Sequence, residues 1–559
     1  MQREVDYLVN RLGPGQVYGD NVSEVTRGIV YHIPRVRDRK QLQRLVNAMF
    51  NSKIWHIPAL DILELYEVTQ AIFRWKLKIS EPSISIKDFY DTWNNAFYSI
   101  RTWTLPQLAI LSGVLSTKTE FLSVQQQYFI DDSSSCARMY DDWMAKHFLP
   151  VWTVMLEKYK SLPPKFEQLV LMYAPLRNKR SGVGINSGNV IQCLFNLVIK
   201  YITSKDDSSF VGRHLNDIAF VLNALVSDGS QAVLSSILHQ LCQVSYDLSL
   251  KELTRQETVR YDVKYYANIM FTFVLILDGC LHNKARIPGL HHQAIMILFY
   301  INFIVQDFGK EEFHSYQRVY QVSASILAHN VDIMNASLQV LLGNIWKTDT
   351  KANTSRIIFM LEFLETTLLH IPINSQYIDK VLQPIIMSYI HSTNSIVREN
   401  AHAVQLSIFQ SPNTSETPIA WKSISLKPYL ELILTQFASN LVSKEQLLTV
   451  YETINSQLPY ISIKYPGIVE ELLQFTFSKV RDCSKIPTKV VLSECLILQC
   501  GALSGDGICK WLDTCQELIT QLPQPGQLEL KWKMWELVKK SRNDAAIQWW
   551  YTHDIHVRL

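Results

Sequence analysis

Hydrophobic residues recur with a helical period along almost the whole chain. Leu42, Leu45, Val46, Met49 and Phe50 occupy positions i, i+3, i+4, i+7 and i+8. Residues at this spacing lie on one face of an α-helix, so the segment predicts an amphipathic helix whose apolar face is buried. The alternation typical of a β-strand is not sustained over any long region. The pattern therefore predicts an all-α protein.

A second stripe, of Ile357, Leu361, Leu364 and Leu368, repeats this spacing in the second half of the chain. Connections rich in Pro, Gly, Ser and Asn interrupt the helical pattern at residues 161–164, 178–189, 411–417 and 521–526. We therefore predict an N-terminal helical region over 1–177, a linker over 178–189 and a central helical region over 190–410. A second linker over 411–425 then leads to a C-terminal helical region over 426–559.

One segment indicates how the helices are arranged. Residues 395–401, followed by Val404, resemble the second helix of HEAT-type repeats, in which a Val-Arg pair precedes a small buried residue. Such helix pairs stack into solenoids that present long surfaces to partners. No fixed period recurs elsewhere, so we expect an irregular α-solenoid with HEAT-like helix pairs in the central region.

Composition narrows the class of protein. The chain has 559 residues, of which 47% are hydrophobic and 19% charged, as in an ordered, core-rich protein. The net charge of +3 is too small to indicate a nucleic-acid partner. No segment reaches the ~18 consecutive apolar residues of a membrane-spanning helix, and the two nearest, at 267–277 and 294–305, read as buried core helices. The odd, scattered set of nine cysteines is unlike a disulfide framework.

Three patterns that could carry chemistry each have a simpler explanation. Glu311-x-x-His314 and Glu399-x-x-His402 have the spacing of helical di-iron proteins, but a chain with 15 histidines produces such pairs by chance. The glycines of residues 182–188 match neither the dinucleotide fingerprint nor the P-loop and are typical of a linker. Cys495 is flanked by leucine and isoleucine, as a small buried residue would be. The sequence predicts no catalytic residue, no metal and no cofactor.

The N-terminal region contains a concentration of positive charge next to the first stripe. Basic side chains lie in or just before it, namely Arg35, Arg37, Arg39, Lys40 and Arg44. A basic amphipathic helix can lie on an anionic membrane or bind a partner. More often such a helix packs its apolar face into the protein core and leaves its charges in water.

The C-terminal tripeptide Val557-Arg558-Leu559 is similar to a targeting signal. A free C-terminal Ser-Lys-Leu, or a close variant, is read by the receptor that imports proteins into peroxisomes. Arg558 and Leu559 supply the cation and the leucine carboxylate, whereas Val557 is larger than the usual small residue. We expect these three residues to be a receptor-binding site.

Several further segments resemble the fungal peroxin-8 family. They occur in the family's order and lie at residues 30–36, 81–90, 93–94, 128–134, 493–497 and 546–552. The resemblance implies a non-enzymatic scaffold of peroxisomal matrix-protein import, peripherally attached on the matrix side of the membrane. It also implies that the protein binds the cargo receptor for C-terminal signals, bridges the docking complex to the RING ubiquitin-ligase complex and takes part in cargo release.

Three alternatives depend on particular residues. Trp549, Trp550 and Tyr551 are either docking aromatics or, at least for the two tryptophans, a hydrophobic cap on the last helix. A cytosolic HEAT-type adaptor or transport receptor is the second functional reading, although it usually has a strongly acidic surface. A helical metalloenzyme built on the two E-x-x-H pairs is the third, and it predicts bound iron or manganese.

Overall fold

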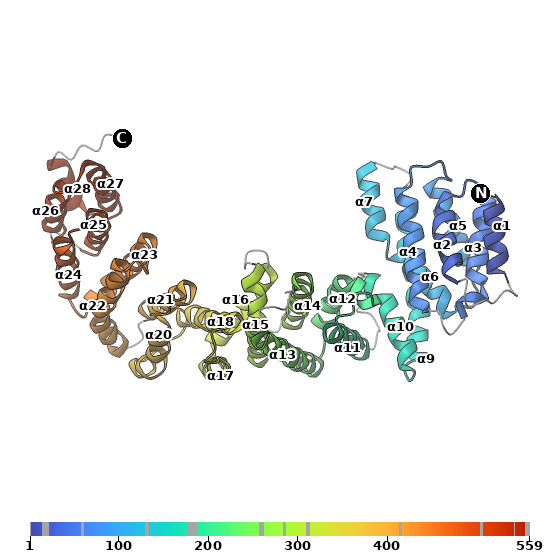
Figure 1. Ribbon diagram of the computed structural model, residues 1–559, viewed down its shortest axis with the longest axis horizontal. Coiled ribbons are helices and arrows are strands. Elements are labelled where there is room, and N and C mark those ends of the chain that lie inside the picture. Colours follow the sequence, from blue (N-terminus) through green and yellow to red (C-terminus); the bar gives the residue numbers. More distant parts are fainter. Residues whose placement is uncertain are drawn as a thin grey trace. The chain divides into compact units, whose positions relative to one another are not determined.

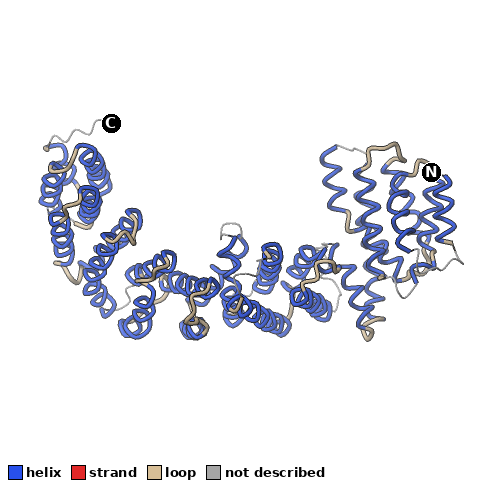
Figure 2. The backbone as a smooth tube through the Cα atoms, in the orientation of Figure 1, coloured by secondary structure: helices blue, strands red, loops and turns tan. Residues whose placement is uncertain are grey.

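The computed structural model consists of α-helices joined by short turns (Figures 1 and 2). No strand occurs in the residues that the structure describes, which are 2–13, 22–56, 61–128, 133–176, 187–255, 262–282, 287–308, 314–412, 416–503, 507–541 and 543–553. The prediction of an all-α protein is confirmed.

The chain divides into two compact units. The first comprises Met1–Asp247, Gln256–Leu290 and Lys310–Val319, and the second comprises Leu248–Arg255, His291–Gly309 and Tyr320–Leu559. The boundary runs through helices rather than through a connecting loop. The division into three regions joined by two linkers stays a prediction, and residues 177–186 of the first linker lie outside the described part of the chain. Most of the second linker is helical, since a helix begins at Glu416.

The first unit begins as a stack of helices in which alternate members pack together. Helix α1 contacts α3 and α3 contacts α5, while α2 contacts α4 and α4 contacts α6. The helices of this part are α1 (Gln2–Leu12), α2 (Val22–His32), α3 (Arg39–Asn51), α4 (Ile62–Lys78), α5 (Ile86–Ser99), α6 (Leu105–Leu115), α7 (Lys118–Tyr128), α8 (Ser133–Asp142), α9 (Leu149–Lys158) and α10 (Pro163–Tyr173). A π-helical turn, Trp143–Phe148, joins α8 to α9.

The predicted stripe of the N-terminal region forms α3. The carboxylate of Asp38 caps this helix by accepting a hydrogen bond from the backbone amide of Gln41. The five apolar residues of the stripe are all buried. Phe50 meets Trp93 and Phe97 edge to face, at ring-centroid distances of 5.8 and 5.4 Å. The apolar face of α3 is therefore part of the core, as the simpler interpretation predicted.

The middle of the chain continues with α11 (Ser187–Ser204), α12 (Phe210–Ser227), α13 (Gln231–Leu253), α14 (Val263–Leu281), α15 (Pro288–Phe308) and α16 (His314–Ala328). Helices α14 and α15, which contain the two apolar segments singled out in the sequence, are long and apolar enough to cross a membrane by length and composition alone. However, 61% and 78% of their apolar windows are buried inside the protein, as in core helices. Both therefore serve the packing of the helical array.

The second unit repeats the arrangement in which alternate helices pack together. Helix α18 contacts α21, α21 contacts α23, α23 contacts α25 and α25 contacts α27. Its helices are α17 (Val331–Gly343), α18 (Lys351–Leu368), α19 (Ser375–Tyr377), α20 (Gln383–Tyr389), α21 (Ser395–Gln410), α22 (Glu416–Ala438), α23 (Lys444–Ser462), α24 (Ile468–Asp482), α25 (Ile486–Cys500), α26 (Gly507–Thr520), α27 (Gln524–Ser541) and α28 (Asp544–Thr552). This pairing confirms an irregular helical-repeat array.

The second predicted stripe lies on α18, but this helix is not amphipathic in the expected sense. Ile357 is only half-buried, whereas Ile358, Phe359 and Met360 are buried although they lie outside the stripe. Helix α18 is enclosed on more than one face because neighbouring helices cover it. A four-residue stripe shows one buried face and does not show whether the other faces are covered.

Candidate functional site

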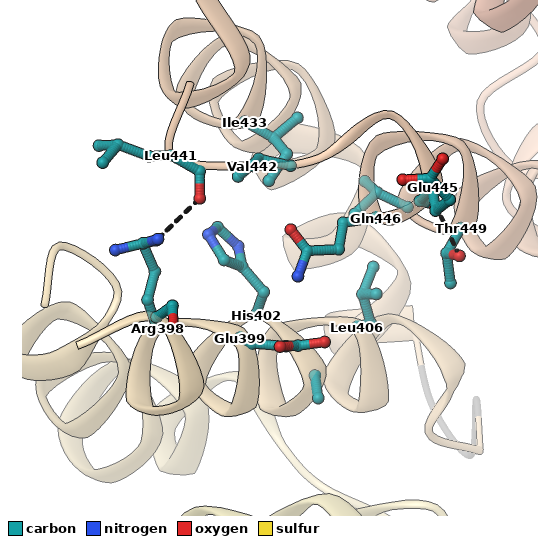
Figure 3. A pocket seen from close by; sticks show the side chains of 13 residues that line it. Arg398, Glu399, His402, Leu406, Ile433, Leu441, Val442, Glu445, Gln446 and Thr449 are labelled. Atoms are coloured by element: carbon teal, nitrogen blue, oxygen red, sulfur yellow. Dashed lines mark hydrogen bonds between the residues drawn. The ribbon is translucent and has the colours of Figure 1, made fainter. Parts of the chain in front are cut away.

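A hollow of about 340 Å³ in the second unit lies between α21, the loop that follows α22, and the start of α23 (Figure 3). In Figure 3, Arg398, His402 and Leu406 project from α21 toward this loop and toward α23. Leu441 and Val442 line the opposite wall. The HEAT-like segment recognised in the sequence therefore contributes one wall of a surface cavity.

Helix α21 owes its position to a cap and an apolar face. The side chain of Asn394 accepts hydrogen bonds from the backbone amides of Ile396 and Val397, at 3.0 and 3.2 Å. Ala401 and Val404 are completely buried. The small side chain of Ala401 sits where the HEAT-like pattern places a small buried residue, and the polar residues of the next turn are left to face the hollow.

Arg398 forms hydrogen bonds across the hollow to the loop between α22 and α23. Its Nε and Nη2 atoms donate to the carbonyl oxygen of Leu441 at 3.2 and 2.7 Å, and its Nη1 atom donates to the carbonyl oxygen of Ser392 at 2.7 Å. The side chain is nearly buried, so these charge-assisted hydrogen bonds compensate for its lost hydration. Arg398 therefore holds the loop between α22 and α23 in place.

His402 is held from both sides. The side-chain amide of Gln436 donates to the carbonyl oxygen of Ile390, so its Oε1 atom accepts from His402 Nε2 at 2.8 Å. Nε2 consequently carries the proton, and Nδ1 accepts from the Tyr429 hydroxyl at 3.1 Å. Burial lowers the pKa of His402, which keeps the ring neutral.

This arrangement leaves no ring nitrogen of His402 for a metal shared with Glu399. In the described ranges, no three His, Cys, Asp or Glu side chains gather into a cluster that could hold a metal ion. Glu311, the partner residue in the other E-x-x-H pair, lies outside those ranges. Cys495 is fully buried, as predicted, and Cys500 and Cys515 pack with their sulfur atoms 3.9 Å apart.

The hollow is thus suited to docking. Leu406 and Val450 supply apolar walls. Among the charged residues that line the hollow, Glu399 and Glu445 have exposed side chains. A hydrogen bond from its own backbone amide lowers the pKa of Glu445, which is therefore ionised at neutral pH. An apolar hollow with carboxylates at its mouth suits an aliphatic side chain that ends in a positive charge.

The predicted basic surface is largely neutralised by the protein. Arg39 pairs with Asp88 at 3.3 Å and Arg44 pairs with Asp6 at 3.0 Å, while Arg37 donates to a backbone carbonyl oxygen. Arg35 ion-pairs with Glu81 at 3.4 Å, and Lys40 is exposed. Because the apolar face of α3 is buried in the core, it is not available to enter a bilayer. The role of these five basic residues as a partner surface stays a prediction.

The three C-terminal aromatic residues separate into two groups. Trp549 and Trp550 are nearly buried, and the indole nitrogen of Trp549 donates to Asp513 at 2.7 Å. Trp550 packs against Trp535 at a ring-centroid distance of 5.2 Å. Tyr551 is 72% exposed. The two tryptophans therefore close the end of the helical array, and Tyr551 is the one that faces solvent.

The tail residues Val557, Arg558 and Leu559 lie outside the described part of the chain, so their role as a receptor signal stays a prediction. Sequence reasoning missed the pocket residues Leu441 and Gln446, which have no motif of their own.

The fold defines this chain as an all-α helical-repeat protein. Two family models match it: the PEX8 helical domain at residues 189–315 and the PEX8 C-terminal domain at residues 420–557. Peroxisomal biogenesis factor 8 of Saccharomyces cerevisiae is 25% identical over 589 aligned residues, covering 98% of each chain. Peroxisomal biogenesis factor 8 of Pichia angusta is 25% identical over 63% of this chain and 60% of its own.

Solved structures give only distant likenesses. The karyopherin Kap121p bound to the extreme C-terminus of the protein phosphatase Cdc14p has a TM-score of 0.28 and 12% identity, covering 99% of this chain and 67% of the karyopherin. An engineered protein has a TM-score of 0.25 and 11% identity, covering 96% of this chain and 99% of its own. The two family models and the two relatives support placing this chain in the peroxin-8 family.

Proposed function

We propose that this chain is a non-enzymatic scaffold of peroxisomal matrix-protein import. The observation that carries the proposal is the match to Peroxisomal biogenesis factor 8 of Saccharomyces cerevisiae, which covers 98% of both chains. An end-to-end match means that the whole helical array, and not one domain of it, corresponds to the relative. A helical array suits a scaffold because stacked helices offer several surfaces at once.

In this proposal the protein is peripherally attached to the matrix side of the peroxisomal membrane. It binds the cargo receptor for C-terminal signals, bridges the docking complex to the RING ubiquitin-ligase complex and takes part in cargo release. The burial of α14 and α15 in the protein core supports peripheral rather than transmembrane attachment. The exposed Tyr551 and the acidic hollow beside α21 are candidate contact surfaces.

The first test is complementation of a yeast strain that lacks its own peroxin-8. The tagged full-length chain should co-purify with peroxisomes, resist added protease until the membrane is opened, and be released by alkaline carbonate. It should also restore import of a fluorescent matrix protein. A diffuse location with import unrestored would refute the proposal and favour the cytosolic HEAT-type adaptor.

The tail is tested separately with the purified cargo receptor. Deletion of Val557, Arg558 and Leu559 should abolish the signal-dependent part of receptor binding, because the receptor holds the leucine and its free carboxylate. Val557→Ser restores a small residue at the first position and should tighten binding. Tyr551→Ala, which leaves the tripeptide intact, is the control. Equal binding by the full-length, deleted and Val557→Ser chains would show that the tail is not a signal.

A further inference from the structure

A second hollow, of about 440 Å³, lies between α2 and α4 in the first unit. The two helices run side by side near the N-terminal end of the chain (Figure 1). Tyr31 from α2 and Trp75 from α4 flank the hollow, and Val30 and Val68 contribute apolar surface to it. Of the residues that line it, only Arg35 belongs to the predicted basic surface.

The two aromatic rings of the hollow are unusually exposed for their size. Tyr31 is 56% exposed and Trp75 is 49% exposed, whereas Trp93 in the neighbouring helix α5 is completely buried. Tryptophan, tyrosine and arginine are the residue types most enriched among those that dominate binding energy at protein interfaces. The hollow brings all three types together on one surface.

Arg35 holds the hollow in a fixed shape. Its guanidinium lies 4.1 Å from the centroid of the Tyr31 ring and 5.8 Å from that of Trp75. Its Nη1 atom donates to the carbonyl oxygen of Tyr31 at 2.9 Å, and its Nε atom lies 3.4 Å from a carboxylate oxygen of Glu81. A ligand would therefore meet rings whose positions are already set, which lowers the entropic cost of binding.

The arginines that line the hollow favour a negatively charged ligand. Arg27 and Arg35 both line the hollow, and none of its lining residues is acidic. Because Arg35 already pairs with Glu81, Arg27 supplies most of the positive charge that a ligand would meet. Arg27 is exposed, and its Nε atom donates to the carbonyl oxygen of Ser23 at 3.2 Å. An apolar hollow with arginines along one side complements a segment that carries carboxylates next to a large apolar side chain.

We propose that this hollow is a docking site for an acidic peptide segment that packs one aromatic or large aliphatic side chain against the exposed rings of Tyr31 and Trp75. A peptide fits better than a lipid surface, because the hollow is recessed between two helices, whereas a bilayer would meet exposed residues that project from a convex face. The inference goes beyond the import scaffold and is tested with purified protein alone.

The probe is a fluorescein-labelled acidic peptide with one central tryptophan, and its matched control has Asn and Gln in place of Asp and Glu. Fluorescence anisotropy with the full-length chain should show at least ~10-fold tighter binding of the acidic probe at low salt. Equal binding of the two probes, or binding of neither, would overturn the proposal. Binding of anionic phosphatidylserine vesicles that requires Trp75 would overturn it in favour of a membrane.

Variants then place the probe in the hollow. Trp75→Ala should weaken binding at least ~10-fold, as truncation of a central aromatic contact does. Trp532→Ala is the matched control, since Trp532 is 39% exposed on α27 in the other unit, and it should bind as the wild type does. An unchanged affinity of Trp75→Ala, or an equal loss in Trp532→Ala, would refute the assignment.

A pair of substitutions at Thr26 separates charge from folding. Thr26 lines the hollow, and Thr26→Glu and Thr26→Gln introduce side chains of equal size. The glutamate should repel the acidic probe and weaken its binding ~5-fold or more relative to the glutamine. Because the two variants differ only in charge, equal affinities would show that the hollow does not read carboxylates.

Discussion

Gly279 marks a place where two helices of the first unit approach too closely for a side chain. A Cβ atom added there would lie 2.6 Å from Cγ2 of Val226 and 2.9 Å from Cα of Asn223, and it would also meet the carbonyl oxygen of Asn223. Two of these three atoms belong to the backbone of α12 and cannot rotate away. Gly279→Ala therefore forces α14 away from α12.

The expected cost follows from three contributions. Overpacking of this kind costs about 1–3 kcal/mol. Separation of the helices also strains the hydrogen bond from Asn223 Nδ2 to the carbonyl oxygen of Leu275, now 2.7 Å long, which contributes about 1 kcal/mol. Alanine in place of a helical glycine returns about 0.5–1 kcal/mol. The net loss of stability is about 1–3.5 kcal/mol.

The assay is amide hydrogen exchange of the full-length chain, because a chain with two compact units need not unfold in one step. Protection of α12 and α14 should fall in Gly279→Ala. Gly289→Ala is the control, since nothing lies within 4 Å of a Cβ at Gly289, and its protection should stay constant. Unchanged protection in Gly279→Ala, or an equal fall in both variants, would refute the reasoning.

Two further predictions concern buried charge. Burial lowers the pKa of Lys422 to about 8, below that of the unfolded chain, so the unfolded state binds more protons above pH 8. Stability should rise with pH between about 8 and 9.5, and urea titrations of Lys422→Met should lack this increment; an identical pH slope would contradict it. Glu494 is nearly buried and lies 3.0 and 2.9 Å from Lys444 and Lys533. Glu494→Gln should lower the free energy of unfolding by about 1–3 kcal/mol. Glu529→Gln, at the exposed end of the same network, should lower it by less than about 1 kcal/mol. Equal urea midpoints for the two variants would contradict this predicted difference.

Local pattern was enough to predict the helices and the burial of α3. The spacing from Leu42 to Phe50 identifies an apolar face without any knowledge of the neighbouring helices. In the structure that face is buried. Part of the connection predicted over 411–425 is helical, because α22 begins at Glu416, and a composition rich in Ser, Thr and Pro does not by itself exclude a helix. The covered faces of α18 depend on neighbouring helices, which a pattern within one helix does not report.

The pockets could not be predicted because their residues are far apart in the sequence. Arg398 was visible in the HEAT-like segment, but its acceptor Leu441 lies 43 residues further on. The E-x-x-H spacing suggested a metal at His402, yet the ring is held by Tyr429 and Gln436, which no local motif connects to it. Spacing within a helix shows which residues share a face, and only the packing of helices shows what each face meets.

The basic residues between Arg35 and Arg44 show that contacts between helices also change the interpretation of a predicted binding surface. From the sequence, their charges look equivalent, and their number suggested a surface for a membrane or a partner. In the structure Arg39 and Arg44 have acidic partners from other helices, which reduces the charge that a ligand would meet. Arg35 also has an acidic partner, Glu81, but it differs in that it stacks on two exposed aromatic rings, at the edge of a hollow that a second arginine lines. The proposed docking site therefore depends on Arg35 and its aromatic neighbours rather than on the summed charge of the segment.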